Sequence, residues 1–580
     1  MPLSLKALRL STAELLACSL CDLFPGTLLI GSVVTDIGFH YDCILKNPID
    51  HSALPLIEER MRTLVRQDIP VKTLDMMRQN AVTFLAHQGQ KLKANIASIM
   101  PNNVIQLIQI GNFVDICLPP YMTSTSEIAS FRLQSIETLD VSIKKNDGVV
   151  TRIHGTAFPD NASLKQFIKR AEEAKKRDHK LIGKEMGLYS FHHETEFCLW
   201  NPKGTILREL LKDWWNKILD NQEFALVTTM PMVPSAIVKT QKNDLSCHSE
   251  IENDDYLACS DPTPLHALMF ATEQPTESEL PIRYRAMAPI TRNLSNEEVC
   301  GLLQSRNCER DYAQTFCSPG QVAEELISSL QFIDKIIKIF GFEHQWYFHT
   351  HRAPQVNKVN WTSAVELLET AMKACGIGYI LDKDKETRYG PRVEIGLTDA
   401  YGRTWAGPHV LIDVMHPELY ELHYRKSDES KQRPVLISRS NFGSIDRFIA
   451  VLIEHYAGIL PLWFTPEQVR IIPVGPKQAV YAESLRTAIK EKGFRVGIDN
   501  RLDALGERVR KAELARVPYI VVVGENEVKK QLITVRSGSK AAVRNGVALG
   551  SFLEQLQEEG GALSLTEQLQ VPCKQDRELG

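Results

Sequence analysis

Arg447 stands in a segment that could bind a phosphate or a purine ring. A short apolar run, Val435–Ile437, predicts a strand, and Gly443 follows it. The next apolar residues have the spacing of one buried helical face: Ile445, Phe448, Ile449, Leu452 and Ile453. Arg447 lies one turn into this predicted helix, where its five guanidinium donors can reach a ligand. For this segment alone, the alternative is a buried strand and helix with a solvated arginine.

The order of strand, glycine, helix and arginine in Pro434–Phe448 resembles motif 3 of the class II aminoacyl-tRNA synthetases. Its residues are most similar to those of the threonyl-tRNA synthetase family. Two further segments, Leu280–Asn293 and Gly301–Phe316, resemble motif 2. By this resemblance Arg292 contacts the α-phosphate of ATP, where a bidentate guanidinium stabilises the charge that grows as an adenylate forms. The resemblance implies ATP with magnesium as cofactor, and Arg292 and Arg447 as catalytic residues.

Composition excludes several classes of protein. A chain of 580 residues is too long for one core, and a net charge of −4 gives no general excess of basic charge for binding nucleic acid. The longest apolar stretch, Leu23–Val34, is interrupted by proline and glycine, so neither a membrane span nor a signal peptide is expected. The twelve cysteines are scattered, and the one CxxC, Cys18 to Cys21, is interpreted as core packing rather than a redox or metal site. A cytoplasmic protein is predicted, without membrane or DNA partners.

The resemblance extends along nearly the whole chain and predicts a multidomain fold of α+β and α/β parts. The expected parts are an editing-like α+β domain (1–161), a linker helix (162–188), a class II synthetase catalytic domain with an antiparallel sheet (189–464), an α/β anticodon-binding domain (465–560) and a polar tail (561–580). In the fourth part, β-branched runs alternate with amphipathic helices, which indicates a parallel-rich sheet covered on both faces. There is no room for the ubiquitin-like domain that begins many family members. Motif 1 makes a homodimer the expected assembly.

The first part lacks the histidines that the resemblance associates with editing. The family's HxxxH positions fall at Leu10 and Glu14, and a further histidine position falls at Cys18. The later Cys–His pair falls at Cys117 and Tyr121. Imidazole is the usual group that activates water near neutral pH, so an editing fold without editing activity is expected. Cys117 is the remaining editing-like residue, with buried packing as its alternative role.

The positions that should hold zinc are also changed. The threonyl family binds zinc through one cysteine and two histidines, and the metal grips the amino and hydroxyl groups of threonine. By resemblance these positions are Thr263, Gln314 and Ser438. Hydroxyl and amide oxygens are poor zinc ligands beside thiolate and imidazole, so zinc is not expected. His266 is interpreted as structural.

Other recognition positions are partly changed and partly kept. Tyr312 replaces a family aspartate, while Leu294, Gln304, Ala406 and Leu411 replace polar family residues. Kept as in the family are Tyr389, Arg392, Glu394, Asp413 and Gly443. The predicted amino-acid pocket therefore consists of Thr263, Tyr312, Gln314, Tyr389, Arg392 and Ser438. In the anticodon-binding domain Glu527 and Arg536 match the family, although the basic run that usually follows is loosened.

Three functions remain open at this point. The chain is an ordinary threonine–tRNA ligase with a zinc-free pocket, a repurposed enzyme that adenylates another amino acid, or a non-catalytic tRNA-binding protein. The sequence favours the third, a divergent paralogue that binds tRNA, with ATP as its expected cofactor. Whether it is an enzyme, and which amino acid or tRNA it binds, cannot be predicted from the residues alone.

Overall fold

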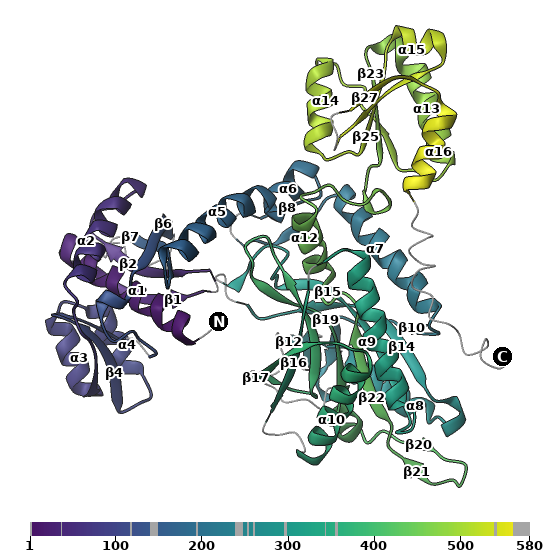
Figure 1. The fold of residues 1–580 in the computed structure, drawn as a ribbon. Coiled ribbons are helices and arrows are strands. Elements are labelled where there is room, and N and C mark those ends of the chain that lie inside the picture. The colour runs from purple at the N-terminus through teal and green to yellow at the C-terminus, as the bar shows by residue number, and fades with distance from the viewer. Residues whose placement is uncertain are drawn as a thin grey trace. The chain divides into compact units, whose positions relative to one another are not determined.

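A computed structural model describes residues 3–35, 37–116, 119–139, 149–192, 195–237, 248–251, 254–258, 261–294, 298–342, 344–353, 358–538 and 542–560. The chain divides into two compact units, residues 1–173 and 174–580 (Figure 1). Cys117 lies outside the described residues.

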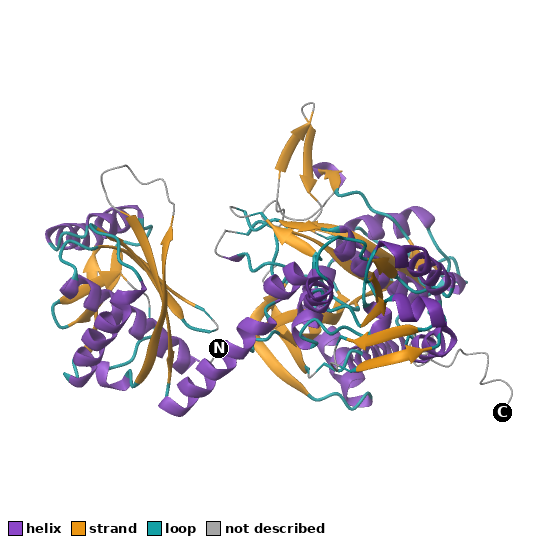
Figure 2. Cartoon of the chain, turned by 90° about the horizontal axis from the view of Figure 1, so that it is seen from above, coloured by secondary structure: helices purple, strands orange, loops and turns teal. Residues whose placement is uncertain are grey.

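The first unit combines helices with two antiparallel sheets. The larger sheet has the order β1-β2-β7-β6, with strands β1 (Leu28–Val34), β2 (Phe39–Leu45), β6 (Ser130–Leu139) and β7 (Val149–Phe158). The helices gather on one side of this sheet in Figure 2, where α1 (Leu3–Leu23) and α2 (Leu54–Arg66) share its core. The smaller sheet consists of β3 (Val71–Met77), β4 (Val104–Ile110) and β5 (Phe113–Ile116), and packs with α3 (Arg78–His87) and α4 (Lys91–Ile99). The predicted α+β class is confirmed.

The predicted linker helix is two helices. The first, α5, runs over Asn161–Arg177 and the second, α6, over His179–Met186. Asp178 separates them, because its side chain accepts a hydrogen bond of 2.7 Å from the N–H of Lys180 and caps α6. Gly187, with φ of 70°, ends α6 in the left-handed conformation. A short hairpin follows, made of β8 (Tyr189–Phe191) and β9 (Cys198–Trp200).

An eight-stranded sheet forms the centre of the second unit, in the order β10-β14-β15-β22-β19-β18-β16-β17. Its strands are β10 (Ala225–Leu226), β14 (Ile282–Thr291), β15 (Asn307–Cys317), β16 (Gln345–Arg352), β17 (Tyr379–Thr387), β18 (Arg392–Thr398), β19 (Thr404–Asp413) and β22 (Val435–Ser440). Only the outermost pair at each edge is parallel. This confirms the antiparallel catalytic sheet.

The two faces of this sheet differ in character. One face packs into an apolar core against four helices, α7 (Pro202–Asp220), α9 (Val322–Ile339), α10 (Lys358–Ala374) and α12 (Ile445–His455). We call it the helix-covered face. The opposite face, here the polar face, carries Arg310, Tyr312 and Gln314 at alternate positions of β15, because successive side chains of a strand point to opposite sides. Helix α8 (Thr263–Glu273) packs on one end of the polar face.

Smaller elements surround this sheet. One three-stranded sheet has the order β11-β13-β12 and a separate hairpin pairs β20 with β21. Their bounds are β11 (Met232–Pro234), β12 (His248–Ile251), β13 (Asp254–Ala258), β20 (Tyr424–Arg425) and β21 (Lys431–Gln432), and the short helix α11 spans His416–Leu419.

The C-terminal part contains a five-stranded sheet of order β24-β23-β25-β26-β27. Its strands are β23 (Val469–Pro473), β24 (Val496–Ile498), β25 (Tyr519–Val523), β26 (Ile533–Ser537) and β27 (Val543–Val547). β23 pairs in parallel with β24 and β25, and helices cover both faces in separate clusters (Figure 1). The helices are α13 (Ala479–Glu491), α14 (Leu505–Leu514), α15 (Glu525–Lys530) and α16 (Leu549–Glu559). The two covered faces agree with the prediction, but the sheet is mixed rather than parallel-rich, because β25 pairs antiparallel with β26 and β26 with β27.

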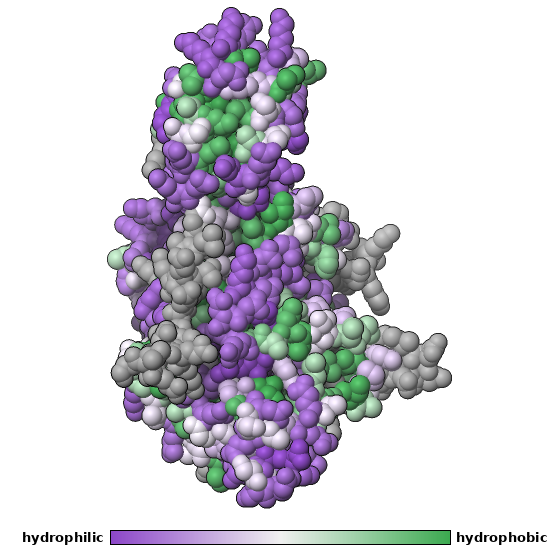
Figure 3. Space-filling view, turned by 90° about the vertical axis from the view of Figure 1, so that its right-hand side faces the viewer, coloured by the Kyte–Doolittle hydropathy of each residue, from purple (hydrophilic) through white to green (hydrophobic). Residues whose placement is uncertain are grey.

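Among the described residues, no helix has both the length and the apolar character needed to cross a membrane. The face shown in Figure 3 is a mosaic of hydrophilic and hydrophobic side chains.

Candidate active site

The motif 3 loop is held by Asp311, which the sequence analysis did not single out. Asp311 belongs to β15 and points to the helix-covered face, where it accepts a hydrogen bond of 2.6 Å from the hydroxyl of Ser440. It also accepts from three successive backbone N–H groups, of Asn441, Phe442 and Gly443, at 2.5, 3.0 and 3.0 Å. The sequence signal for Asp311 was a carboxylate at a strand position whose side chain faces the apolar side of the sheet. Asp311 thereby fixes the entry into α12.

Arg447 lies in the first turn of α12 and its guanidinium is held in place. Its Nε–H donates to the carbonyl of Leu303 at 2.6 Å and its Nη1 to that of Ala406 at 2.7 Å. The guanidinium carbon lies 5.5 Å from the ring centroid of Trp405. Burial, followed by the charge of Arg292, lowers the pKa of Arg447 to about 10. Arg447 is therefore charged at neutral pH, and the charge of Arg292 lowers its pKa in the same direction as burial.

The three positions matched to zinc ligands are brought together on the polar face. Gln314 of β15 lies opposite Ser438 of β22 in the strand register. The Nε2 of Gln314 donates to the hydroxyl of Thr263, at the start of α8, over 2.7 Å. All three are buried, with exposed fractions of 3% for Thr263, 0% for Gln314 and 6% for Ser438.

Two of these side chains, Gln314 and Thr263, belong to a directed chain of hydrogen bonds that also includes His266 and Asp261. The Oε1 of Gln314 accepts from Nδ1 of His266 at 2.5 Å, and the hydroxyl of Thr263 donates to Oδ1 of Asp261 at 2.6 Å. Burial lowers the pKa of His266, which favours the neutral imidazole. The three matched positions themselves offer two hydroxyls and an amide, with no thiolate or imidazole, so this donor set does not fit zinc. His266 contacts it through Gln314.

The retained residues Tyr389 and Arg392 occupy the same region of the sheet. The ring of Tyr389 packs 4.7 Å from that of His416, whose Nδ1 donates to Asp413 at 2.6 Å. Burial opposes protonation of His416, but the carboxylate of Asp413 raises its pKa overall. Arg392 forms an ion pair with Glu394. Burial lowers the pKa of Arg392, while Glu394 opposes this effect.

Two further polar-face residues, Arg310 and His409, were missed by the sequence analysis. The Nη2 of Arg310 lies 3.2 Å from Nε2 of His409, and its guanidinium carbon lies 5.6 Å from the ring centroid of Tyr312. Burial and the charges of Arg392 and Arg310 hold the pKa of His409 well below its usual value. The alternation of Arg310, Tyr312 and Gln314 along one strand was the signal that places Arg310 beside the predicted pocket.

The predicted anticodon residues have different surroundings. Glu527 lies in the first turn of α15, where Oε2 accepts from the N–H of Gly524 at 2.9 Å and Oε1 from the hydroxyl of Thr534 at 3.0 Å. Burial opposes it, but these hydrogen bonds lower the pKa of Glu527. Arg536, on β26, lies 3.7 Å from Glu513 with 40% of its side chain exposed. Glu527 caps a helix, while Arg536 has a more accessible side chain.

In the first unit, positions matched to editing histidines are occupied by apolar packing. Leu10 of α1 packs with Ile108, and Tyr121 packs against the same small cluster. Glu14 is buried, and its Oε1 accepts from the hydroxyl of Ser32 at 2.7 Å. Burial raises the pKa of the Cys18 thiol to about 12, which favours the protonated form. Cys117 stays a prediction.

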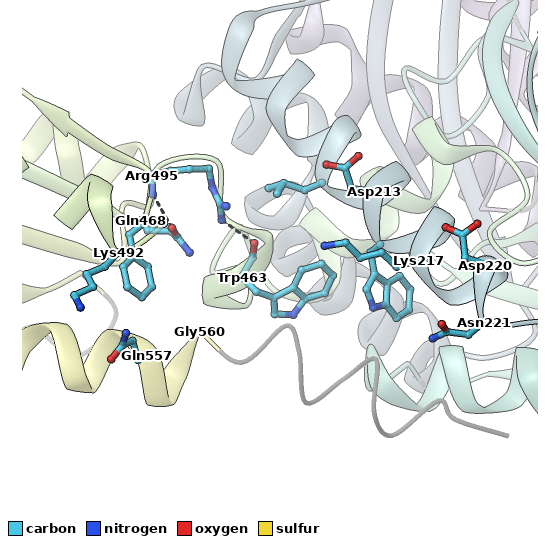
Figure 4. A pocket seen from close by; sticks show the side chains of 14 residues that line it. Asp213, Lys217, Asp220, Asn221, Trp463, Gln468, Lys492, Arg495, Gln557 and Gly560 are labelled. Carbon is cyan, nitrogen blue, oxygen red and sulfur yellow. Dashed lines mark hydrogen bonds between the residues drawn. The ribbon is translucent and has the colours of Figure 1, made fainter. Parts of the chain in front are cut away.

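A carboxylate–histidine group and a large cleft lie apart from these residues. Asp178, His179 and Glu454 could together hold a metal ion, but Nδ1 of His179 bonds Glu454 at 2.7 Å and its Nε2 accepts from the N–H of Leu302 at 3.2 Å. This arrangement is a hydrogen-bonded junction. Figure 4 shows a cleft of about 810 Å³ between α7 and the C-terminal sheet domain. Its lining includes Asp213, Lys217, Trp463, Lys492 and Arg495, and none of the predicted site residues.

Comparisons with known proteins agree with the fold and its motifs. Residues 247–456 match the family model of the tRNA synthetase class II core domain (G, H, P, S and T), and residues 468–559 match that of the anticodon binding domain. The threonine–tRNA ligase of Lawsonia intracellularis is 32% identical over 540 residues, covering 92% of this chain and 84% of that protein. The threonine–tRNA ligase of Dehalococcoides mccartyi strain 195 is 31% identical over 545 residues, covering 92% and 93%.

A solved structure gives the same result. The RNA binding domain of threonyl-tRNA synthetase from Cryptosporidium parvum superposes with a TM-score of 0.62 and 26% identity, covering 66% of this chain and 98% of that one. The chain therefore belongs to the threonyl-tRNA synthetase family.

Proposed function

We propose that this protein is a tRNA-binding member of the family in which zinc-dependent threonine activation and editing are lost. The observation that carries the proposal is the hydrogen-bonded chain from His266 through Gln314 and Thr263 to Asp261. At two of the three positions matched to metal ligands, the amide of Gln314 donates to the hydroxyl of Thr263. Recognition of threonine in such a site would need a new set of hydrogen bonds to its hydroxyl, because a pocket of the same shape rejects valine poorly.

The loss of editing is supported by the packing of the first unit. Water activation needs a base that titrates near neutral pH, which imidazole supplies and an aliphatic or phenolic side chain does not. Leu10 and Tyr121 meet in one apolar cluster at positions where the resemblance places histidines. Glu14 is buried and bonded to Ser32.

Binding of tRNA is supported by two features. The anticodon-binding domain matches its family model over residues 468–559. Helix α5 exposes six basic side chains, at Lys165, Lys169, Arg170, Lys175, Lys176 and Arg177. Contacts from such side chains to phosphates release counterions, so binding of tRNA should weaken steeply with salt.

A second candidate function is adenylation of another amino acid. It is supported by the motif 2 and motif 3 arginines, Arg292 and Arg447, and by the effect of the Arg292 charge on the pKa of Arg447. A carboxylate oxygen of the amino acid would attack the α-phosphorus of bound ATP, forming an aminoacyl adenylate and releasing pyrophosphate, and the two arginines would hold the phosphates. A homodimer formed through motif 1, a cytoplasmic location and the predicted domain boundaries belong to the same proposal.

The test is a set of measurements on one purified sample: metal content, threonine-dependent exchange of pyrophosphate into ATP, and tRNA binding at two salt concentrations. We expect no stoichiometric zinc, no exchange with threonine and salt-sensitive tRNA binding. Zinc together with threonine-dependent exchange would overturn the proposal. Exchange with a different amino acid would establish the second candidate instead. Failure to bind a tRNA pool at either salt concentration would exclude the tRNA-binding role.

A further inference from the structure

A pocket of about 620 Å³ lies behind motif 2, between the β8–β9 hairpin and the ends of β14 and β15. Two lining residues of β14, Pro289 and Thr291, pair in register with Glu309 and Asn307 of β15, which also line it. Paired residues point to the same side of a sheet, and Glu309 alternates with Arg310, so these four side chains point to the helix-covered face. We call this cavity the hairpin pocket. Among the described residues that line it, none belongs to the predicted catalytic or amino-acid set.

The walls of the hairpin pocket are largely apolar. Phe197, Cys198 and Trp200 line it from the hairpin, and Val299 lines it from the motif 2 loop. The ring of Trp200 is held by Arg208, whose guanidinium carbon lies 4.9 Å from its centroid. Phe197 is half exposed, so part of its ring is open to solvent. Pockets for small organic molecules have about 300–1,000 Å³ and apolar walls with a few polar groups, so this cavity suits a small molecule with an apolar body.

One wall of the hairpin pocket carries a buried carboxylate, that of Asp446 in α12. Asp446 is 3% exposed, and its Oδ1 accepts no hydrogen bond from the described part of the chain. Nη1 of Arg208 lies 3.7 Å from Oδ1, an ion-pair contact beyond hydrogen-bond distance. Nη2 of Arg208 donates to Glu309 instead, and Lys212 pairs with Glu309 at 2.8 Å. The cations beside Asp446 therefore make their hydrogen bonds with Glu309.

The environment of Asp446 opposes its negative charge. Burial raises the pKa of Asp446 to about 6, and the charge of Arg208 offsets only part of that rise. A buried carboxylate with too few donors destabilises a fold, and such groups gather at functional sites. The last torsion of an aspartate is soft, so the carboxylate can turn an oxygen towards a donor in the pocket. A cationic N–H suits it best, because it supplies charge and hydrogen bond together. The structural alternative is an anchor of α12 to Arg208.

We propose that the hairpin pocket binds a small organic cation, a primary amine on an apolar body. The ammonium group would donate to Asp446, and the body would lie against Phe197 and Trp200. Asp446 and Thr291 directly precede the two predicted catalytic arginines in the chain, so an occupant would contact their neighbours from the helix-covered side of the sheet. The inference goes beyond the proposed function and does not depend on it.

The test is calorimetric titration of the full-length protein with three probes that share an indole ring. Tryptamine carries an ammonium group, tryptophol carries a hydroxyl in its place, and indole-3-acetate carries a carboxylate. We expect tryptamine to bind about tenfold or more tightly than tryptophol, because only the amine brings a positive charge to Asp446. Indole-3-acetate should bind more weakly than either, because its charge is repelled by Asp446.

Two variants separate the carboxylate from the apolar wall. Asp446→Asn should weaken tryptamine about tenfold or more and leave tryptophol nearly unchanged, which removes the preference for the amine. Phe197→Ala should weaken both probes by a similar factor and keep the preference, because it removes a contact to the indole that both share. Asp334→Asn is the matched control. Asp334, on α9, pairs with Lys338 at 2.6 Å and does not line the pocket, so its substitution should leave both affinities unchanged.

The proposal is overturned if tryptamine does not bind, if tryptophol binds as tightly as tryptamine, or if Asp446→Asn binds tryptamine as well as the unaltered protein does. The last result would show that Asp446 only anchors α12. Circular dichroism checks that each variant is folded, and Asp446→Asn should fold because it removes a buried charge. None of these measurements uses zinc, threonine or tRNA, so they can fail while the proposed function stands, and the reverse also holds.

Discussion

Two arginines on opposite faces of the same sheet have different environments. Arg439, on the helix-covered face, donates from Nη2 to Gln222 at 2.7 Å and lies 4.9 and 4.7 Å from the ring centroids of Phe224 and Phe332. Burial lowers its pKa to about 10. Arg310, on the polar face, takes its contacts from Tyr312 and His409, which belong to the sheet itself. Arg439 is therefore packed between the sheet and aromatic side chains of the core, whereas Arg310 contacts residues of its own sheet.

Buried polar groups occur on both faces. On the helix-covered face, Asp311 receives donors from Ser440, Asn441, Phe442 and Gly443, which ties motif 2 to motif 3. On the polar face, Gln314 bonds Thr263 and His266. Inaccessible nitrogens without hydrogen-bond partners are found on both faces, at Nε of Arg310 and at Nε of Arg439. The faces therefore differ in which polar groups bond one another.

The largest expected change tests the polar face by restoring metal ligands. Thr263→Cys, Gln314→His and Ser438→His together should create a zinc site, because Gln314 bonds Thr263 and lies opposite Ser438. Metal analysis of the purified triple variant should find about one zinc per chain. The double variant without Ser438→His is the control and should retain less metal after dialysis. If the triple variant folds but binds no zinc, the three side chains do not lie close enough together to hold one metal ion.

The next largest effect is expected when a buried side chain is shortened to alanine on the helix-covered face, compared with the same kind of change on the polar face. Phe448 of α12 is fully buried against Phe340, Phe342 and Phe442. Phe448→Ala should lower the free energy of unfolding by about 3–5 kcal/mol, because it removes a large apolar group and leaves a cavity. Ser438→Ala should change it by less than about 1 kcal/mol. Urea denaturation measures both, and a similar loss in the two variants would argue against the contrast between the faces.

Much of the fold could be predicted because its signals are local. The apolar run Val435–Ile437 lies within β22, and the helical spacing after Gly443 is α12. The break in the linker was missed because Asp178 acts through a cap within an otherwise helical pattern. In the site, Thr263, Gln314 and Ser438 were identified by matching motif positions, and their roles stay predictions.

The missed residues depend on strand register instead. Matching positions one at a time does not reveal that Arg310 of β15 faces His409 of β19, almost a hundred residues later in the chain. Nor does it reveal that Asp311 accepts from a loop on another strand. The bond from His266 to Gln314 was not predicted for the same reason, since the two residues are remote in sequence. Non-local hydrogen bonds have no periodicity that a sequence can display.

The third prediction concerns pH and Asp446, a buried residue within motif 3. Burial, only partly offset by Arg208, raises its pKa from 3.8 to about 6. The pKa of Asp446 is higher in the folded state than in the unfolded state. Its ionised carboxylate therefore destabilises the folded protein above about pH 6, and this penalty disappears as the pH falls from about 6 to about 4. Asp446→Asn should therefore raise the free energy of unfolding at pH 7.5 by about 2–3 kcal/mol, from 1.36 kcal/mol per pKa unit.

The gain from Asp446→Asn should shrink towards zero between about pH 6 and pH 4, which urea denaturation at several pH values measures. Asp213→Asn, an exposed carboxylate of α7, is the control and should show no such trend. A gain that is the same at every pH would mean that the substitution acts through packing rather than through the charge of Asp446.

The smallest expected effect comes from removing a single threonine hydroxyl from each face of the sheet. Thr263→Val keeps the shape of the side chain but removes the acceptor of Gln314 and the donor to Asp261, so it should cost about 1–2 kcal/mol. Thr315→Val makes the same change in a buried residue of the helix-covered face and should stay within about 0.5 kcal/mol. Thr263→Ser restores the hydroxyl and should recover most of the loss. An equal loss of free energy of unfolding in the two valine variants would contradict this prediction. It would mean that the hydrogen bonds of Thr263 to Gln314 and Asp261 do not stabilise the protein.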